Sequence, residues 1–335
     1  MKVVKDFVRP PSGKGASVAL GLFDGLHIGH RQVLEAALHS GELAPCVFTY
    51  TISSQIPQNK KNYSTLMPDE QKCALLEQMG FEMVVMPEFD SFKDVEPREF
   101  VERMLIEGMG ARELSCGYDF TFGKKGAGDT RLLSQVAAEH GVGLNIIQPV
   151  LLDGKPVSST RIRQAILDGR MDDASRMLGR RFCIRLKVEH GNQIGRMLDF
   201  PTINQVFPRF HIVPRYGVYS TIVNIDGKLY GGVTNVGVKP TVGSDGPLAE
   251  TYILDFSGDY TARPSRSISF ALSARSGASK VSTACVSRLL RTNAACRRRL
   301  HRTSNRCCLW IVWCSPISLY KKRQNAPLQK EFAVL

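Results

Sequence analysis

Residues 17–30 read SVALGLFDGLHIGH, and this stretch decides how the rest of the chain is organised. Its first four residues predict a short buried strand. The apolar residues between Val33 and Leu38 then recur at helical spacing, so we expect a helix to begin near His30. The stretch therefore predicts a strand, a glycine-rich turn and the N-terminus of a helix.

The glycine-rich turn has the composition of an anion site. Gly21, Gly25 and Gly29 allow a ligand to approach the backbone closely. Free N–H groups and the positive end of the helix dipole favour a negative charge at the helix N-terminus. His27 and His30 lie three residues apart and are expected to point to the same side, where two imidazoles suit a polyphosphate whose charge grows during a reaction. The loop is neither a Walker A loop nor a Gly-x-Gly-x-x-Gly loop.

Two alternatives to a phosphate site remain open from these residues alone. The turn also fits a tight connection whose histidines only cap the helix. A metal pair that includes Asp24 is the other alternative, although the sequence offers no third and fourth ligand at a useful spacing.

The length of 335 residues suggests two domains. We expect no membrane span, since no run of eighteen apolar residues occurs, and no signal peptide, since residues 1–10 are too charged. The expected compartment is therefore the reducing cytosol.

The net charge of +13 is unevenly distributed along the chain. Residues 261–335 contain fifteen Lys and Arg but one acidic residue, which leaves 29 basic and 30 acidic residues in 1–260. Five of the nine cysteines and both tryptophans also lie in this tail. A basic nucleic-acid footprint across the whole protein is therefore excluded.

The first 180 residues predict an α/β domain. Short apolar runs alternate with amphipathic segments, a pattern typical of a parallel sheet that binds ligands at the carboxyl ends of its strands. Beyond 17–20, we expect strands over 45–50, 83–87, 114–117 and 144–150, and helices over 68–79, 97–105, 131–140 and 158–167.

A second domain is expected over 181–260. Alternating stretches at 182–188, 217–223, 231–237 and 250–256 are separated by glycine-rich turns, which indicates a β-barrel. Asp226-Gly227 predicts a hairpin turn inside it.

Two further stretches of the first domain carry possible ligand chemistry. Residues 117–123, GYDFTFG, taken alone fit a hairpin with buried aromatic rings. Residues 158–163, SSTRIR, open a helix and fit an N-cap with a basic first turn. Because the helix dipole disfavours arginine at a helix N-terminus, Arg161 and Arg163 there indicate a bound anion.

Together these stretches resemble a known family. Gly-x-Phe-Asp-Gly-x-His-x-Gly-His resembles the HxGH nucleotidylyltransferases, and in its long form the adenylyltransferase half of bacterial bifunctional riboflavin kinase/FAD synthetases. Residues 117–123 and 158–163 are similar to two further motifs of that half, while 195–204 and 235–241 resemble the riboflavin kinase signature. The resemblance implies a Rossmann-like HxGH domain followed by a small β-barrel, with FMN made from riboflavin and FAD from FMN, using ATP twice.

The resemblance also implies roles for individual residues of the first domain. His27, His30 and Arg163 would be catalytic, with the two histidines on the ATP phosphates. Asp119 would contact the flavin, as would Tyr50, although the family's Phe-x-Pro-His-Pro is replaced here by TYTIS at 49–53. The implied ATP-binding residues are Gly21, Phe23, Asp24, Gly25, Gly29, Ser159 and Thr160.

For the kinase domain the resemblance implies that Thr202 and Asn204 bind Mg²⁺ with ATP, since a hard cation prefers oxygen ligands. Glu250 aligns with the base that takes the proton from the riboflavin 5′-hydroxyl. Asp199 and Ile203 replace small residues of the signature, so altered nucleotide affinity is expected.

The tail departs from the expected pattern. The resemblance ends near Tyr260, and the following residues are taken as a non-native, frameshifted and disordered translation. The barrel is then expected to lack a strand, which would impair the kinase step. Two other functions remain as alternatives: a nucleotidylyltransferase with a different acceptor, and a nucleic-acid-binding protein that uses its basic tail.

Overall fold

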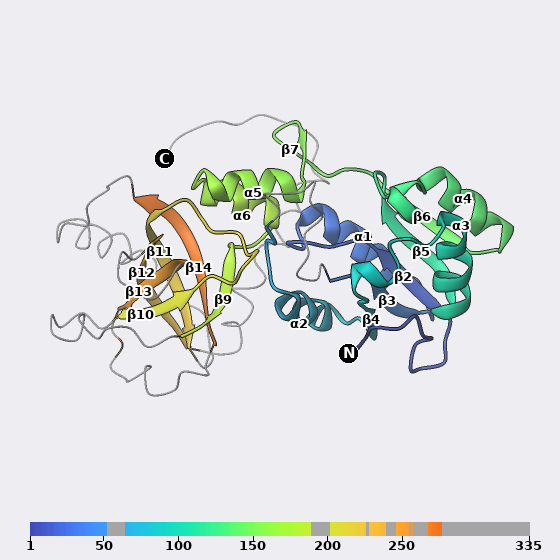
Figure 1. The fold of residues 1–335 in the computed structure, drawn as a ribbon, viewed down its shortest axis with the longest axis horizontal. Helices are drawn as coiled ribbons and strands as arrows, with labels where there is room; N and C mark the ends of the chain where they lie inside the picture. The colour runs from blue at the N-terminus through green and yellow to red at the C-terminus, as the bar shows by residue number, and fades with distance from the viewer. Residues whose placement is uncertain are drawn as a thin grey trace, which may run out of the picture. The chain divides into compact units, whose positions relative to one another are not determined.

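The computed structural model describes residues 1–51, 64–188, 202–225, 228–238, 246–254, 256 and 267–276 (Figure 1). The chain divides into two compact units. Unit 1 comprises Met1–Arg163 and Arg209–Ile212, and unit 2 comprises Gln164–Pro208 and the chain from Val213 onward. The division falls inside helix α5 (Ser159–Leu167). The boundary near residue 180 that the sequence suggests stays a prediction.

Unit 1 is built on a six-stranded sheet with the order β1-β4-β3-β2-β5-β6. Every neighbouring pair in it is parallel, which confirms the predicted α/β class. The edge strand β1, which pairs with β4, was not expected from the sequence. The strands are β1 (Lys2–Val4), β2 (Ala16–Leu20), β3 (Ala44–Phe48), β4 (Met83–Val85), β5 (Ala111–Gly117) and β6 (Gly143–Ile147).

Both faces of the sheet are covered, which explains why β2 is apolar at nearly every position. Ala16, Val18 and Leu20 face one layer of the core, while Ser17 and Ala19 alternate to the opposite face. The hydroxyls of Ser17 and Ser40 are hydrogen-bonded at 2.8 Å, which places the end of helix α1 on that opposite face.

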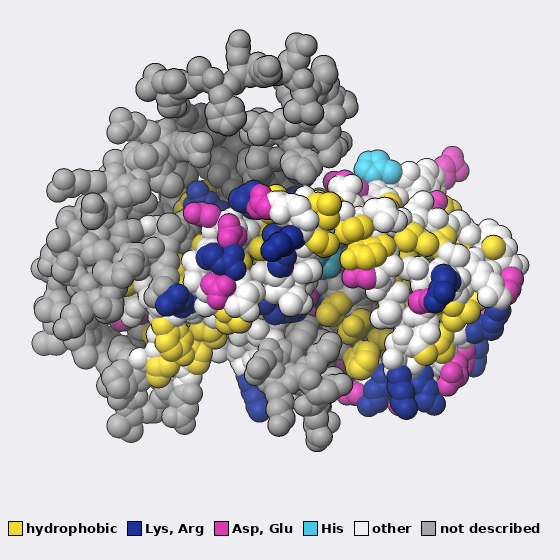
Figure 2. Space-filling model, turned by 90° about the horizontal axis from the view of Figure 1, so that it is seen from above, with side chains coloured by type: hydrophobic (Ala, Val, Ile, Leu, Met, Phe, Trp, Pro, Cys, Tyr) yellow, Lys and Arg dark blue, Asp and Glu magenta, His cyan; other side chains and the backbone are white. Residues whose placement is uncertain are grey.

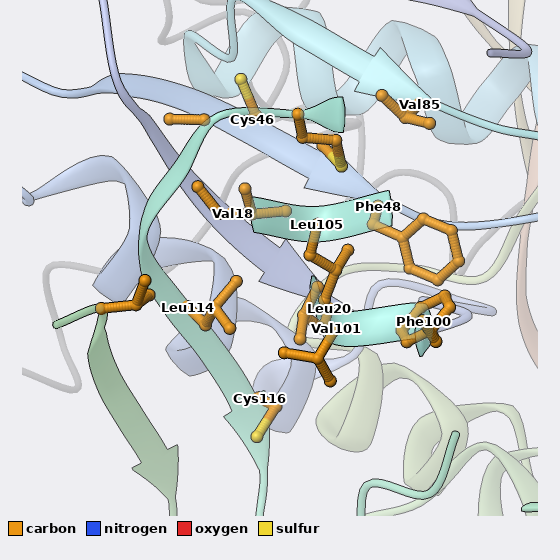
Figure 3. Packing of buried hydrophobic residues seen from close by; sticks show 14 of the residues in the cluster. Val18, Leu20, Cys46, Phe48, Val85, Phe100, Val101, Leu105, Leu114 and Cys116 are labelled. Carbon is orange, nitrogen blue, oxygen red and sulfur yellow. The ribbon is translucent and has the colours of Figure 1, made fainter. Parts of the chain in front are cut away.

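The larger core layer joins β2–β5 to the helices over them (Figure 3). Phe100, Val101 and Leu105 pack against strand residues such as Phe48 and are at most 1% exposed. Burial raises the pKa of the Cys46 and Cys116 thiols to about 12, so these two cysteines act as packing groups.

The helices of unit 1 follow the predicted order. Helix α1 begins at Ile28, two residues before the expected start, and α2 ends at Gly80 with a φ of +98°. Helix α3 continues as a π-helix, in which the Met109 N–H donates to the Met104 carbonyl at 3.0 Å. The helices are α1 (Ile28–Leu38), α2 (Asp69–Met79), η1 (Phe89–Ser91), α3 (Pro97–Glu99), η2 (Phe100–Gly108), η3 (Lys124–Gly126) and α4 (Thr130–Glu139), followed by a small hairpin of β7 (Leu151–Leu152) and β8 (Lys155–Pro156).

Unit 2 begins with the end of α5 and helix α6 (Met171–Leu178) and contains a six-stranded antiparallel sheet. Its order is β10-β13-β12-β11-β14-β9. The two ends of the sheet approach each other, since Gln205 Nε2 donates to the Leu186 carbonyl at 2.9 Å. The strands are β9 (Cys183–Lys187), β10 (Thr202–Val206), β11 (Gly217–Ile225), β12 (Lys228–Val238), β13 (Pro247–Ile253) and β14 (Ser267–Ser276).

Strand β14 corrects the expectation for the tail. It pairs antiparallel with β11 on one side and β9 on the other, so Ser267–Ser276 of the tail forms an interior strand of the sheet. The expectation that the sheet lacks a strand here is wrong. Residues 257–266 and 277–335 lie outside the described residues, as do Asp199 and the rest of 189–201, the Asp226-Gly227 turn and 239–245.

On the face drawn in Figure 2, Lys and Arg side chains of the described residues stand among Asp and Glu side chains, in keeping with the balanced charge of residues 1–260. No helix in the described parts of the chain has the length and apolar character that a membrane crossing requires.

The placement of β14 can be tested by Ala271→Pro. The backbone of Ala271 is paired with Ile222 on one side and Cys183 on the other, and proline removes an N–H donor in mid-sheet. We expect the thermal unfolding transition of unit 2 to be lost or lowered by more than 10 °C.

Ala271→Ser is the matched control, because it keeps the backbone donor. Equal unfolding temperatures for the proline variant and the unmodified chain would show that β14 is not part of the folded sheet.

Candidate active site

The candidate site of unit 1 lies at the carboxyl edge of the parallel sheet. From β2 the chain continues through β3 and β4 on one side of the sheet, and β5 then pairs with β2 on its other side. The order of the strands therefore reverses direction beside β2. Such a reversal is the usual ligand position in open α/β sheets. The segments that follow β2, β3 and β5 are 21–27, 49–51 and 118–123, and they contain Phe23, Tyr50 and Asp119.

The loop after β2 has an unusual backbone. Phe23, Gly25 and Leu26 have φ values of +54°, +85° and +41°, and two of these three residues are not glycine. The Gly21 N–H donates to the Phe48 carbonyl at 3.2 Å, which anchors the start of the loop. A Cβ atom at Gly29 would lie 3.2 Å from ring atoms of His27, so a larger residue there would crowd the folded-back histidine ring.

The two histidines lie on the same side, as the spacing predicted. Their rings stack with centroids 3.5 Å apart and planes 15° apart, and the edge of Phe23 packs on His30 at 5.4 Å. His27 Nδ1 accepts a hydrogen bond of 3.1 Å from the His30 N–H, so the capping alternative is correct for one nitrogen of His27. The cap fixes the His27 ring, and the stacking orients His30 beside it.

Asp24 forms a buried ion pair with Arg163, the last residue of unit 1 in helix α5. Arg163 Nη2 donates to Asp24 Oδ2 at 2.5 Å, and the Leu66 N–H donates to Asp24 Oδ1 at 2.9 Å. Arg163 Nε donates to the Ser64 carbonyl at 2.6 Å. Burial raises the pKa of the Asp24 carboxyl, while Arg163, the Leu66 N–H and Lys72 oppose that rise.

The N-terminus of α5 meets the same loop. Ser159 Oγ donates to the Asp24 carbonyl at 2.8 Å, while Thr160 is exposed at the start of the helix. Ser158 Oγ accepts from the Arg161 N–H at 3.2 Å, so the N-cap interpretation of the motif is correct for Ser158. Arg161 donates to the carbonyls of Leu152, Lys155 and Pro156, which leaves Arg163 as the arginine that reaches the loop after β2.

The two residues expected to contact flavin lie in different surroundings. Tyr50 packs in an aromatic cluster with Phe89 and Phe92, at ring distances of 5.3 and 5.7 Å, and burial raises the pKa of its hydroxyl. Asp119 is exposed in the turn after β5. Of the aromatic rings of the same motif, Phe122 is buried, Phe120 is partly buried and Tyr118 is exposed. An antiparallel bridge between Phe122 and Gly128 agrees with the hairpin interpretation of this stretch.

Lys72 is a residue of the site that the sequence reasoning missed. It is 3% exposed, and its Nζ donates to the Leu22 carbonyl and to Thr49 Oγ1, both at 3.3 Å, while Asp69 Oδ1 lies 3.1 Å away. The signal for Lys72 was its position on the same face of α2 as the buried Leu75 and Leu76. A lysine on an apolar helix face indicates a buried partner, because such a face rarely carries an unpaired charge.

The predicted kinase residues of unit 2 lie on the paired strands β10 and β13 of the antiparallel sheet. Asn204 of β10 is the direct partner of Glu250 in β13, and Glu250 is in turn the partner of Asn235 in β12. Thr202 Oγ1 donates to Glu250 Oε1 at 3.1 Å. The sheet therefore holds Thr202, Asn204 and Glu250 in register, which corrects the expectation that a missing strand would leave them without a scaffold.

Neither unit contains, within its described residues, three or more His, Cys, Asp or Glu side chains grouped as metal ligands. Thr202 and Asn204 would bind a cation through neutral side-chain oxygens and so lie outside this class of ligand group.

Comparisons with known proteins point to one family. A family model described as FAD synthetase matches residues 9–161, and one described as riboflavin kinase matches residues 178–275. The bifunctional riboflavin kinase/FMN adenylyltransferase of Pseudomonas fluorescens is 36% identical over 261 residues, covering 74% of this chain and 81% of that protein. The protein of the same name from Bacillus subtilis strain 168 is 32% identical over 248 residues, covering 71% and 78%. A solved structure, named a macrolide-efflux protein from Streptococcus pneumoniae, has a TM-score of 0.71 at 26% identity and covers 90% of this chain and 99% of that one.

The riboflavin kinase match corrects the expected end of the resemblance. It extends to residue 275, beyond Tyr260, and so includes most of β14.

The buried ion pair predicts a pH-dependent cost for Arg163→Met. Without the guanidinium, the Asp24 carboxylate stays buried and unpaired, which typically costs about 3–5 kcal/mol of unfolding free energy. Because the folded-state pKa of Asp24 is then raised further, the loss should be full above that pKa and shrink as the pH falls and Asp24 binds a proton. Urea unfolding between pH 5 and 8 measures it.

Arg161→Met is the matched control, since Arg161 donates to carbonyls and should show no such pH dependence. The double variant Asp24→Asn/Arg163→Met should recover most of the lost stability. A pH-independent loss in Arg163→Met, or no recovery in the double variant, would contradict the buried-pair account.

Proposed function

Since the chain belongs to the bifunctional riboflavin kinase/FMN adenylyltransferase family, we propose that the site around His27, His30, Asp24 and Arg163 carries out the adenylylation of FMN. The observation that carries this proposal is the stacked histidine pair at the N-terminus of α1, next to the loop that Ser159 and Arg163 of α5 hold from the other side. Two helix N-termini and two imidazoles form a surface suited to a triphosphate.

In the proposed reaction, a phosphate oxygen of FMN attacks the α-phosphorus of ATP and the bond to pyrophosphate breaks. The protein has to align the two phosphates and stabilise the charge on the transferring and leaving groups. His30 and His27 would donate hydrogen bonds to the ATP phosphates, with Thr160 and the N-terminus of α5 opposite them. Gly21, Gly25 and Gly29 would belong to the nucleotide site, where Gly21 and Gly29 leave room for the Phe23 and His27 rings. Phe23 and Asp24 would hold the loop in its conformation.

The flavin contacts of Tyr50 and Asp119 stay predictions. Asp119 is exposed after β5, next to the strand whose loop carries the histidines, which supports its assignment. Tyr50 already packs on Phe89 and Phe92, so its ring would contribute to the wall of the flavin site and not as an isolated stacking partner.

For the kinase step we propose Glu250 as the base that accepts the 5′-hydroxyl proton of riboflavin. Thr202 and Asn204 would hold Mg²⁺ with ATP. Asn204 Oδ1 is buried without a hydrogen-bond partner among the described residues, and such an orphaned oxygen fits a cation ligand. When bound, the cation would neutralise the charge of the ATP phosphates.

The weakened kinase step stays a prediction, although the missing strand that was its reason is not supported, since β14 is present. The altered nucleotide affinity expected from Asp199 also stays a prediction. A different acceptor and nucleic-acid binding through the tail are alternatives that an assay of FMN-dependent pyrophosphate release separates from FAD synthesis. Two reactions that consume ATP fit the expected cytosolic location.

We expect His30→Ala to lower the kcat of FAD synthesis from FMN by a factor of about 10²–10³, the typical effect of removing one preorganised donor. Riboflavin phosphorylation by the same protein should stay unchanged. His39→Ala, at the opposite end of α1, is the matched control, since the exposed His39 ring bonds to the Glu35 carbonyl of its own helix. Full FAD synthesis by His30→Ala would remove His30 from the mechanism.

Glu250→Gln should give the opposite result. The amide keeps an oxygen that can accept from Thr202 Oγ1, but it cannot take a proton, so the kcat of riboflavin phosphorylation should fall at least about 100-fold. Conversion of FMN to FAD should be retained. Equal loss of both activities would indicate unfolding in place of a missing base, and retained phosphorylation would exclude Glu250.

A further inference from the structure

The segment Arg209–Ile212 belongs to unit 1, although it lies within the residues that the riboflavin kinase family model matches. Its neighbours in sequence, Pro208 and Val213, belong to unit 2. The segment is therefore a short excursion of the kinase part of the chain into the unit that carries the histidine pair.

The segment pairs with residues 64–66 as a parallel bridge between Thr65 and His211. The Thr65 N–H donates to the Phe210 carbonyl at 2.7 Å, and the Ile212 N–H donates to the Thr65 carbonyl at 2.9 Å. Thr65 Oγ1 adds a hydrogen bond of 3.2 Å to the Phe210 carbonyl. His211 and Ile212 are 5% and 1% exposed, so the bridge is enclosed and not a surface contact.

The residues on either side of Thr65 hold the ion pair of the candidate site. The Ser64 carbonyl accepts from Arg163 Nε, and the Leu66 N–H donates to Asp24 Oδ1. Each of the two partners of the ion pair is thus tied to the backbone of 64–66, and that backbone is tied by Thr65 to Phe210 and Ile212.

We propose that Arg209–Ile212 is a positioning element of the adenylyltransferase site, which sets the position of Arg163 and Asp24 through the backbone of 64–66. This inference rests on the role of Arg163 in the proposed function. It also implies that one positioning element of this site lies outside residues 1–180. No residue of the segment has to contact a substrate.

The backbone of Phe210 supports a positioning role. Its φ of +71° is unfavourable for a residue with a side chain, and such a conformation persists only where surrounding interactions hold it. The two hydrogen bonds from Thr65 to the Phe210 carbonyl are such interactions.

The test uses the full chain with Ile212→Pro, which removes the N–H donor to Thr65, and with Ile212→Val as a matched control that keeps it. We expect kcat/KM for FMN adenylylation to fall about tenfold in the proline variant, as a small displacement of catalytic groups does. Riboflavin phosphorylation should stay within about twofold of the unmodified chain, and Ile212→Val should match that chain in both reactions.

A double-mutant cycle with Arg163→Lys separates positioning from general destabilisation. The lysine keeps a positive charge, but its single nitrogen replaces the Nε and Nη2 atoms with which Arg163 reaches Ser64 and Asp24. Adding Ile212→Pro to it should therefore cost less than adding it to the unmodified chain. Additive losses, or equal losses of both activities, would overturn the proposal. Thr65→Val removes the hydroxyl hydrogen bond to the Phe210 carbonyl and should show the same selective loss at a smaller size. Wild-type adenylylation in both Thr65→Val and Ile212→Pro would also overturn the proposal.

The cycle also distinguishes this inference from the proposed function. If Arg163→Lys lowers adenylylation while Ile212→Pro does not, the site assignment stands and the role of the segment is wrong. If Arg163→Lys itself has unchanged activity, the assignment of Arg163 is wrong and the positioning route through it fails as well.

Discussion

The arrangement of unit 1 depends on keeping a carboxylate inside the protein. Asp24 is 5% exposed, and a carboxylate removed from water is costly unless a cation and N–H donors surround it. The two donors come from far apart in the sequence, Leu66 before α2 and Arg163 in α5, and the charge of Lys72 in α2 acts at longer range. The hydrogen bonds to the Asp24 carboxylate therefore connect the loop after β2, the segment before α2 and the N-terminal turns of α5. The loop after β2 also leads into the histidine pair.

The two sites are held by different means. In unit 1 the functional side chains stand on loops and helix starts at the carboxyl edge of a parallel sheet, so hydrogen bonds such as Ser159 to Asp24 set their positions. In unit 2 the candidate residues stand on the strands themselves, and the register of β10 with β13 places Asn204 opposite Glu250. A shift in loop conformation would affect the first site, whereas the second would change only if a strand slipped by whole residues.

Much of this could be predicted because the strongest sequence patterns are local. Buried strands such as Ala16–Leu20, helix ends such as Gly80 and the spacing of His27 and His30 all depend on neighbouring residues. Contacts between distant segments left weaker signals. The three residues of β1 are too few to show a period, and nothing near Phe210 in the sequence indicates Thr65 as its partner. For β14 a signal was present and was overlooked, since Ile268, Phe270 and Leu272 alternate with small residues inside a stretch whose basic composition suggested no fold.

The distance in sequence between Thr65 and Phe210, 145 residues, has a consequence for the order of events on the ribosome. All strands of the parallel sheet, and the part of α5 that belongs to unit 1, are present in the nascent chain once Arg163 has emerged, but the partner of Thr65 follows only with Arg209–Ile212. At synthesis rates of about 5–20 residues per second, these two points are separated by roughly 2–10 seconds. During that interval the first unit has its sheet but not its last backbone bridge, so its final hydrogen bonds form while the antiparallel sheet is still being made.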